Sequence, residues 1–119
     1  MKLDKRLSKV YQYLDKDKNL ADIGCDHGYL CIEYALNNDA IIYAIDNKLG
    51  PINQCIKNVS KCNLTKKIKP ILSDGIKDID ENIKQISICG MGGINMIDIF
   101  KENINKLSSI ETMVLQPNN

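Results

Sequence analysis

Apolar side chains recur along the chain with alternating helical and strand-like spacing. Leu3, Leu7, Val10, Tyr11 and Leu14 predict an amphipathic helix over residues 3–14, and helical spacing returns around residues 30–35, 51–59 and 94–104. The short apolar runs between and after these segments predict strands at residues 19–24, 40–46, 68–74, 86–89 and 112–115. Strands that alternate with helices predict an α/β fold, with one parallel sheet of about five strands and helices on both faces.

Two prolines refine this pattern. Pro51 suits the first turn of a helix, because its fixed φ and missing N–H are tolerated there. Pro70 falls inside the predicted strand at residues 68–74, where it removes one donor from the hydrogen-bonding ladder. We therefore expect this segment to be a strand only if it lies at an edge of the sheet.

The composition limits the size and the class of the protein. With 119 residues, of which 44% are hydrophobic, the chain has enough material for one domain with one core. The formal net charge is only +1, whereas a chain that binds mainly by neutralising phosphates is usually more basic. Basic residues gather at Lys2, Lys5, Arg6 and Lys9 and again at residues 66–69, and a solvated surface is the simpler interpretation of both clusters.

The cysteines and the terminal segment indicate a cellular compartment. None of the five cysteines forms a C-x-x-C pair, and the chain has a single histidine, so we expect neither a metal site nor a disulfide framework. The N-terminus is charged rather than apolar, and the longest strongly apolar run, residues 40–45, is too short to cross a membrane. These features predict a soluble cytoplasmic protein with thiols that are mostly buried and reduced.

Polar residues and glycines concentrate where the predicted strands end, and parallel sheets bind ligands beyond those ends. Asp22, Gly24, Asp26 and Gly28 follow the first predicted strand, where the glycines permit either a plain tight turn or a close approach to a ligand. A dinucleotide-binding G-x-G-x-x-G loop would need glycine at Asp26 and Tyr29, and Asp26 would repel a pyrophosphate. The spacing is instead similar to the looser first motif of S-adenosylmethionine methyltransferases, whose cofactor carries no phosphate.

Acidic residues end the next two predicted strands. Asp46 lies roughly twenty residues beyond the glycine loop, where an acid accepts hydrogen bonds from a ribose diol; a helix cap or a turn is the alternative. Asn47 and Lys48 would then border the adenosine. Asp74 and Gly75 end the third strand, where they would form either a contact with the adenine or a turn.

The segment Gly90–Gly93 ends the fourth predicted strand with three glycines in four residues. This density indicates either a backbone that passes close to a ligand or a tight, closely packed turn from strand to helix. Many methyltransferases that act on exocyclic amines carry an Asp/Asn-Pro-Pro-aromatic motif at this place, and it is absent from this sequence. That absence argues against methylation of an exocyclic amine but not of a ring nitrogen.

Three motifs together resemble one family. The segments 21–30 (ADIGCDHGYL), 88–93 (ICGMGG) and 115–118 (LQPN) occur in the order found in the TrmK family, the bacterial methyltransferases of N1 of adenine 22 in tRNA. The resemblance covers essentially the whole chain. It implies a Rossmann-like class I methyltransferase domain over residues 1–119, S-adenosylmethionine as the cofactor, tRNA as the partner, and no metal.

The resemblance also implies roles for individual residues. Asp26 would be catalytic, stabilising the charge that develops on the methylated ring or accepting its proton, and a cofactor or structural contact is the alternative. Tyr29 would stack on the target adenine, or else fill the contact between helix and sheet. His27, Tyr29, Met91 and Asn118 would lie towards the substrate. For His27, a packed structural residue is the alternative. The cofactor would contact Asp22, Gly24, Cys25, Asp26, His27, Gly28, Asp46, Asn47, Asp74, Gly75, Gly90 and Met91.

The sequence departs from the family in two ways. Cys25 and Gly28 stand where serine and alanine are common, and we expect both changes to be tolerated. The family continues with further strands and a helical C-terminal domain, so we expect this chain to be a fragment whose last strand exposes an unpaired edge that favours association. Methylation of a small molecule or a protein, or cofactor or tRNA binding without turnover, are the functional alternatives.

Overall fold

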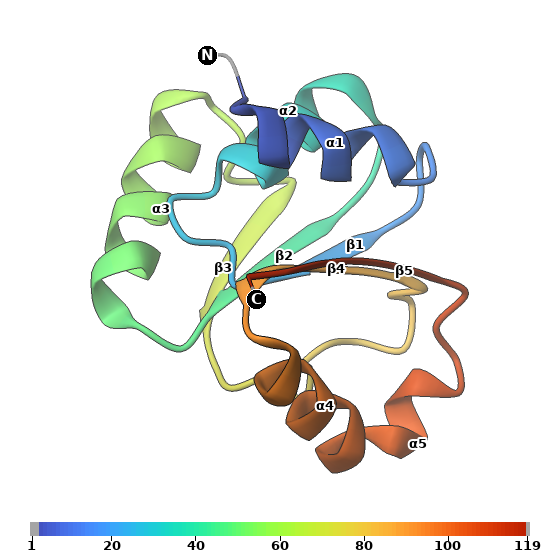
Figure 1. Ribbon diagram of the computed structural model, residues 1–119. Helices are drawn as coiled ribbons and strands as arrows, with labels where there is room; N and C mark the ends of the chain where they lie inside the picture. Colours follow the sequence, from blue (N-terminus) through green and yellow to red (C-terminus); the bar gives the residue numbers. More distant parts are fainter. Residues whose placement is uncertain (1–2, 119) are drawn as a thin grey trace.

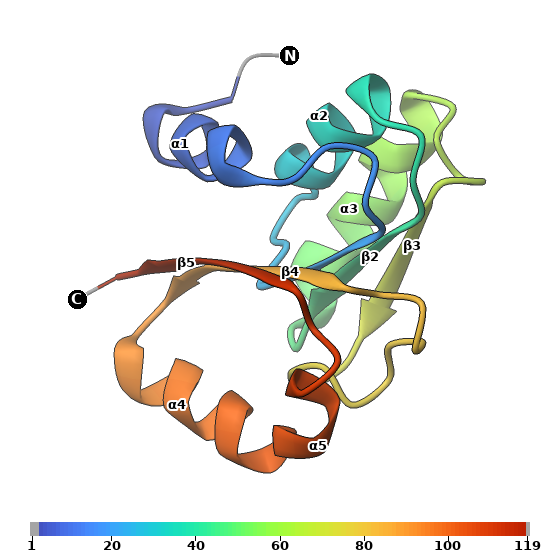
Figure 2. The ribbon, with the colours of Figure 1, turned by 90° about the vertical axis from the view of Figure 1, so that its right-hand side faces the viewer.

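The computed structural model describes residues 3–118. Met1, Lys2 and Asn119 of the predicted domain, and with Lys2 one member of the first basic cluster, lie outside the described residues. One parallel sheet in the order β3-β2-β1-β4-β5 has α1, α2 and α3 on one face and α4 and α5 on the other (Figures 1 and 2). This is the predicted Rossmann-like arrangement. The elements are α1 (Lys5–Tyr13), β1 (Leu20–Ile23), α2 (Tyr29–Asn37), β2 (Ile42–Asp46), α3 (Leu49–Lys61), β3 (Ile68–Leu72), β4 (Gln85–Met91), α4 (Gly93–Glu102), α5 (Ile104–Leu107) and β5 (Thr112–Pro117).

The first helix forms where the hydrophobic spacing predicts it. Asp4 caps α1, because its carboxylate accepts a hydrogen bond from the backbone N–H of Leu7 at 2.8 Å. Val10 is buried, and Leu3, Leu7 and Tyr11 pack partly buried beside it. The opposite face of α1 stays in solvent.

Side chains of the sheet alternate between two apolar cores, because successive residues of a strand point to opposite faces. Leu20 joins the core beneath α1, α2 and α3, and its neighbour Ala21 joins the core above α4 and α5. All four residues of β1 are buried, as expected for a central parallel strand.

The two edges of the sheet differ. Pro70 lies in β3, which is an edge strand, as the proline requires. The other edge is β5, where Met113 and Leu115 are 48% and 41% exposed. Within residues 3–118, β5 is the outermost strand on this side of the sheet, and association through this edge stays a prediction.

The helical region after the fourth strand is divided in two. Sequence spacing places residues 94–104 on one helix, whereas α4 ends at Glu102 and α5 begins at Ile104. Between them the side chain of Asn103 donates a hydrogen bond to the carbonyl of Ile99 at 2.8 Å. Asparagine competes for backbone groups in this way and so favours the end of a helix, which is why the prediction of one helix is wrong here. Within residues 3–118, no helix combines the length and the apolar character needed to cross a membrane.

Candidate functional site

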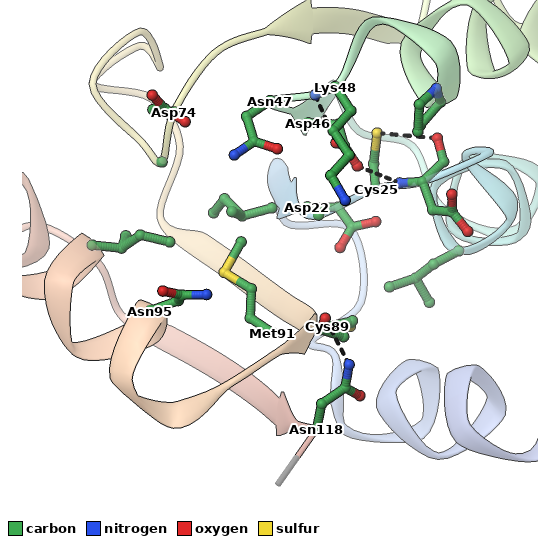
Figure 3. A pocket seen from close by; sticks show the side chains of 18 of the residues that line it. Asp22, Cys25, Asp46, Asn47, Lys48, Asp74, Cys89, Met91, Asn95 and Asn118 are labelled. Carbon is green, nitrogen blue, oxygen red and sulfur yellow. Dashed lines mark hydrogen bonds between the residues drawn. The ribbon is translucent and has the colours of Figure 1, made fainter.

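A cleft of about 650 Å³ opens at the carboxyl ends of the strands (Figure 3). Its walls include residues that follow β1, β2, β3 and β4, together with residues from α1 and α4. Of the predicted site residues, all line this cleft except Gly28: Asp22, Gly24, Cys25, Asp26, His27, Tyr29, Asp46, Asn47, Asp74, Gly75, Gly90, Met91 and Asn118. The strand-end prediction therefore brings residues from across the chain into one place.

Gly24 lets two central strands approach each other. Its φ is +77°, and a Cβ atom at this position would lie 2.8 Å from the carbonyl oxygen of Cys89. The backbone N–H groups of Gly24 and Cys25 both donate to the carbonyl of Ile45, at 2.8 and 2.9 Å. A side chain at position 24 would separate these strands and distort the floor of the cleft.

Gly28 lies behind the turn rather than in the lining of the cleft, and the cofactor contact predicted for it stays a prediction. It adopts a φ of +84° just before α2, and a Cβ atom there would lie 2.6 Å from the sulfur of Cys55. Its backbone N–H donates to the carbonyl of Cys25 at 2.9 Å. Gly28 therefore allows the turn before α2 to pack closely against Cys55 of α3.

Asp22 is a buried carboxylate in the floor of the cleft. Ser87 donates to one of its oxygens at 2.7 Å, and the Cys31 thiol donates to the other at 3.4 Å. Burial raises the pKa of Asp22 to about 6, although both hydrogen bonds favour the ionised form. A cationic ligand would offset this burial and keep the carboxylate ionised.

Asp46 connects the ends of β1 and β2. One of its oxygens accepts from the backbone N–H of Lys48 at 3.0 Å, and the other accepts from the backbone N–H of Asp26, also at 3.0 Å. The first bond is the turn role considered as the alternative for Asp46. Each carboxylate oxygen has a second lone pair, so the side chain can still accept hydrogen bonds from a ligand.

The predicted substrate side contains an aromatic pair. The rings of His27 and Tyr29 meet edge to face, with centroids 5.7 Å apart, and Nε2 of His27 lies 3.8 Å from a carboxylate oxygen of Asp26. Tyr29 is 40% exposed and so does not fill the contact between helix and sheet. Tyr29 lines the cleft, and its stacking on the target base stays a prediction.

The end of β4 forms the opposite wall. Asn118 donates from its side chain to the carbonyl of Gly90 and from its backbone to the carbonyl of Met91, both at 2.8 Å. Met91 projects into the cleft between Asp22 and Asn95 (Figure 3). The LQPN motif therefore contributes by holding the Gly-Met-Gly-Gly turn in place.

Sequence reasoning missed two groups of cleft residues. Arg6 of α1 lines the cleft, although its basic cluster is interpreted from the sequence as a solvated surface. One face of α4 lines the other end of the cleft, with Asn95, Asp98, Ile99 and Glu102. Their spacing of three and four residues places them on one side of a helix and could have been recognised in the sequence.

The cysteines behave mainly as small apolar residues. Cys25, Cys31, Cys55 and Cys89 are buried, and Cys62 is exposed. Burial raises the pKa of Cys89 to about 12, and the charge of Arg6 opposes this shift. Among residues 3–118, no group of three or more histidine, cysteine or acidic side chains is placed to hold a metal ion.

Comparison with known proteins agrees with this architecture. The tRNA (adenine(22)-N(1))-methyltransferase of Bacillus subtilis is 36% identical over 99% of this chain and 50% of its own length. A Rossmann-superfamily protein from Streptococcus agalactiae is 42% identical with a TM-score of 0.95, covering 100% of this chain and 54% of its own. The M. capricolum TrmK, solved with S-adenosyl-homocysteine, is 36% identical with a TM-score of 0.86, covering 98% and 53%.

These similarities confirm the resemblance to TrmK proteins that the three motifs indicate. The chain spans about half the length of the relatives it matches. The model of the methyltransferase domain family matches residues 3–119. The chain therefore belongs to the methyltransferase domain family.

Proposed function

We propose that this chain is the cofactor-binding domain of an S-adenosylmethionine-dependent methyltransferase that methylates N1 of adenine 22 in tRNA. The observation that carries the proposal is the cleft, in which the three sequence motifs meet at the carboxyl ends of the strands. The B. subtilis relative is named for this activity, and the M. capricolum relative was solved with the product of this cofactor.

The residues of the cleft fit this cofactor. Asp22, Asp26, Asp46 and Asp74 line it, and such carboxylates suit a ligand that carries an ammonium and a sulfonium. The same charges disfavour a dinucleotide, whose pyrophosphate would lie among acids. Asp46 would accept hydrogen bonds from the ribose, Asn47 and Asp74 would border the adenosine, and Asp22, Gly24 and Gly90 would surround the amino-acid part.

When bound, the cofactor supplies an activated methyl group. Adenine N1 already carries a lone pair, so the chain needs no base to create the nucleophile. Its residues would instead align the ring and exclude water. Tyr29 would stack on the target base, and His27, Met91 and Asn118 would lie beside it.

Asp26 would stabilise the product. The methylated ring is cationic until it loses a proton from N6, and a nearby carboxylate lowers the energy of that charge. Asp26 is 70% exposed, and its backbone is held by Asp46, so its carboxylate is available at the mouth of the cleft. The proposed acceptor of the N6 proton is this carboxylate.

The test is methyl transfer with mapping. The chain, and separately a relative of full length, are incubated with methyl-labelled S-adenosylmethionine and unmodified tRNA, and the labelled nucleotide is identified by mass spectrometry. We expect the label at N1 of adenine 22. Label in a protein or a small molecule in the absence of RNA would show that the substrate is not tRNA. Cofactor binding with no methyl transfer by either protein would show a binding module rather than an enzyme.

A further inference from the structure

The sequence contains one arginine, Arg6. It lies in the wall of the cleft, outside the strand-end motifs. It projects from α1, and its Nη1 donates to the side-chain oxygen of Gln116 at 3.1 Å. The same oxygen accepts from the backbone N–H of Gly90 at 3.2 Å. Gln116 therefore ties the arginine to the turn that ends β4.

Gly90 provides the space in which the guanidinium lies. A Cβ atom at this position would come within 3.2 Å of Nη1 of Arg6, and Gly90 has a φ of +71°. A side chain at position 90 would meet the guanidinium and would also strain the backbone. The glycine of the Gly-Met-Gly-Gly turn thus leaves the arginine close to the backbone at the end of β4.

Arg6 forms no ion pair within residues 3–118. Its guanidinium donates instead to the neutral side-chain amide of Gln116. One bond uses one of the five N–H donors of a guanidinium. The side chain is therefore held in place while most of its donors remain available for an anion.

The other cation of the cleft has a different setting. Lys48 follows Asp46 and Asn47 at the end of β2 and points towards Asp22 in the middle of the cleft (Figure 3). Its charge is thus placed among carboxylates. Asn118 and Cys89 lie on the side of the cleft away from Asn47 and Asp74. Arg6 belongs to this side, because it shares the side-chain oxygen of Gln116 with the N–H of Gly90, the residue after Cys89.

We propose that Arg6 binds the carboxylate of the amino-acid part of the cofactor. This inference rests on the proposed function, because it concerns the cofactor of that reaction. S-adenosylmethionine carries one carboxylate, which needs a cation in a cleft whose charged side chains are mostly acidic. The planar guanidinium matches a carboxylate with two parallel hydrogen bonds. Arg6 is held by the neutral amide of Gln116 at the end of β4, whereas Lys48 points towards Asp22.

The test compares two ligands that differ only in that carboxylate. The affinities of S-adenosylmethionine and of decarboxylated S-adenosylmethionine are measured by calorimetry for the wild type and for Arg6→Gln. We expect Arg6→Gln to weaken S-adenosylmethionine roughly 10- to 100-fold, as for loss of a charged hydrogen bond. The affinity for the decarboxylated ligand should stay within about threefold or rise, because it loses no partner and meets one cation fewer.

Three further variants sharpen the result. Lys5→Gln removes a charge from the same helix outside the cleft and should leave both affinities unchanged. Gln116→Glu gives Arg6 an acidic partner and should weaken S-adenosylmethionine selectively. Lys48→Gln tests the competing cation. Thermal unfolding of each variant confirms that it is folded.

If the wild type and Arg6→Gln bind S-adenosylmethionine equally well, this inference is overturned and the proposed function is not. If Arg6→Gln then also binds tRNA more weakly, Arg6 is assigned to a phosphate of the substrate. Equal weakening of both ligands, or selective loss in Lys48→Gln instead, also overturns it. If the folded wild type binds neither ligand, the proposed function fails and the inference fails with it.

Discussion

At the scale of the residue, the site combines a buried carboxylate with an exposed aromatic ring. Asp22 is 2% exposed, whereas Tyr29 is 40% exposed at the mouth of the same cleft. The buried carboxylate therefore acts on the stability of the fold as well as on a ligand. The exposed ring is free to act on a substrate.

Asp22 should make the unfolding free energy depend on pH. Its pKa is raised from 3.8 to about 6 on folding, so the folded state holds this proton more tightly than the unfolded state. Its contribution is present below pH 4 and is lost as the pH rises to 6, which amounts to roughly 3 kcal/mol. We expect Asp22→Asn to gain about this much relative to the wild type between pH 4 and pH 7, as measured by urea unfolding. Parallel pH curves for the two proteins would contradict the assignment.

Tyr29 should matter through its ring. Stacking on a base contributes about 1–3 kcal/mol, so Tyr29→Ala should lower kcat/KM for tRNA roughly 10- to 100-fold in the protein that shows transfer. Tyr29→Phe keeps the ring and serves as the matched control, with activity close to the wild type. Binding of S-adenosylhomocysteine should be unchanged in both variants. Full activity of Tyr29→Ala would exclude stacking.

At the scale of the element, sequence reasoning succeeds where hydrophobic spacing and strand ends decide the structure. The alternation of strands and helices predicts the sheet, and Pro70 correctly marks an edge strand. The strand-end rule gathers Asp22, Asp46 and Gly90 into one cleft. These features follow from short stretches of sequence, so they can be predicted without knowing how distant elements pack.

Sequence reasoning fails where two elements distant in the chain meet. Hydrophobic spacing identifies the buried face of α1 but cannot show that its exposed Arg6 lies over the end of β4, which depends on the packing of α1 against β5. The motif suggested a ligand contact for Gly28, whereas Cys55 of α3 occupies the space beside it. Such contacts depend on tertiary packing.

Gly28 and Cys55 should therefore be coupled energetically. Gly28→Ala places a Cβ atom 2.6 Å from the sulfur of Cys55 in a left-handed backbone, so we expect a loss of at least about 1 kcal/mol in urea unfolding. The same substitution should cost less in a Cys55→Ala background, where the sulfur is absent.

Gly50→Ala is the control for this cycle. Gly50 lies in α3 with nothing within 4 Å of its Cβ position, so alanine there should stabilise the helix by up to about 1 kcal/mol. An equal cost of Gly28→Ala in both backgrounds would show that the sulfur does not restrict this position.

At the scale of the whole molecule, the two edges of the sheet should differ in their tendency to associate. Pro70 interrupts the donors of β3, whereas β5 presents Met113 and Leu115 at an edge without a proline in its middle. We expect the weight-average mass to rise with concentration in sedimentation equilibrium. Met113→Lys should reduce this rise, and Met113→Leu, which stays apolar, should not.

If the mass of the wild type is that of a monomer at all concentrations, or if Met113→Lys associates as strongly as Met113→Leu, then β5 is not an associating edge. Equal thermal stability of the two variants would confirm that the comparison concerns the surface rather than the fold.

The acid-lined cleft should accept an adenosyl amino acid and reject a diphosphate. Calorimetric titration of the folded chain with S-adenosylhomocysteine, and in parallel with NAD, distinguishes these two ligand classes. We expect saturable binding of S-adenosylhomocysteine at a single site per chain and no measurable binding of NAD. Folded protein that shows no heat with S-adenosylhomocysteine, or that binds NAD equally well, would contradict it.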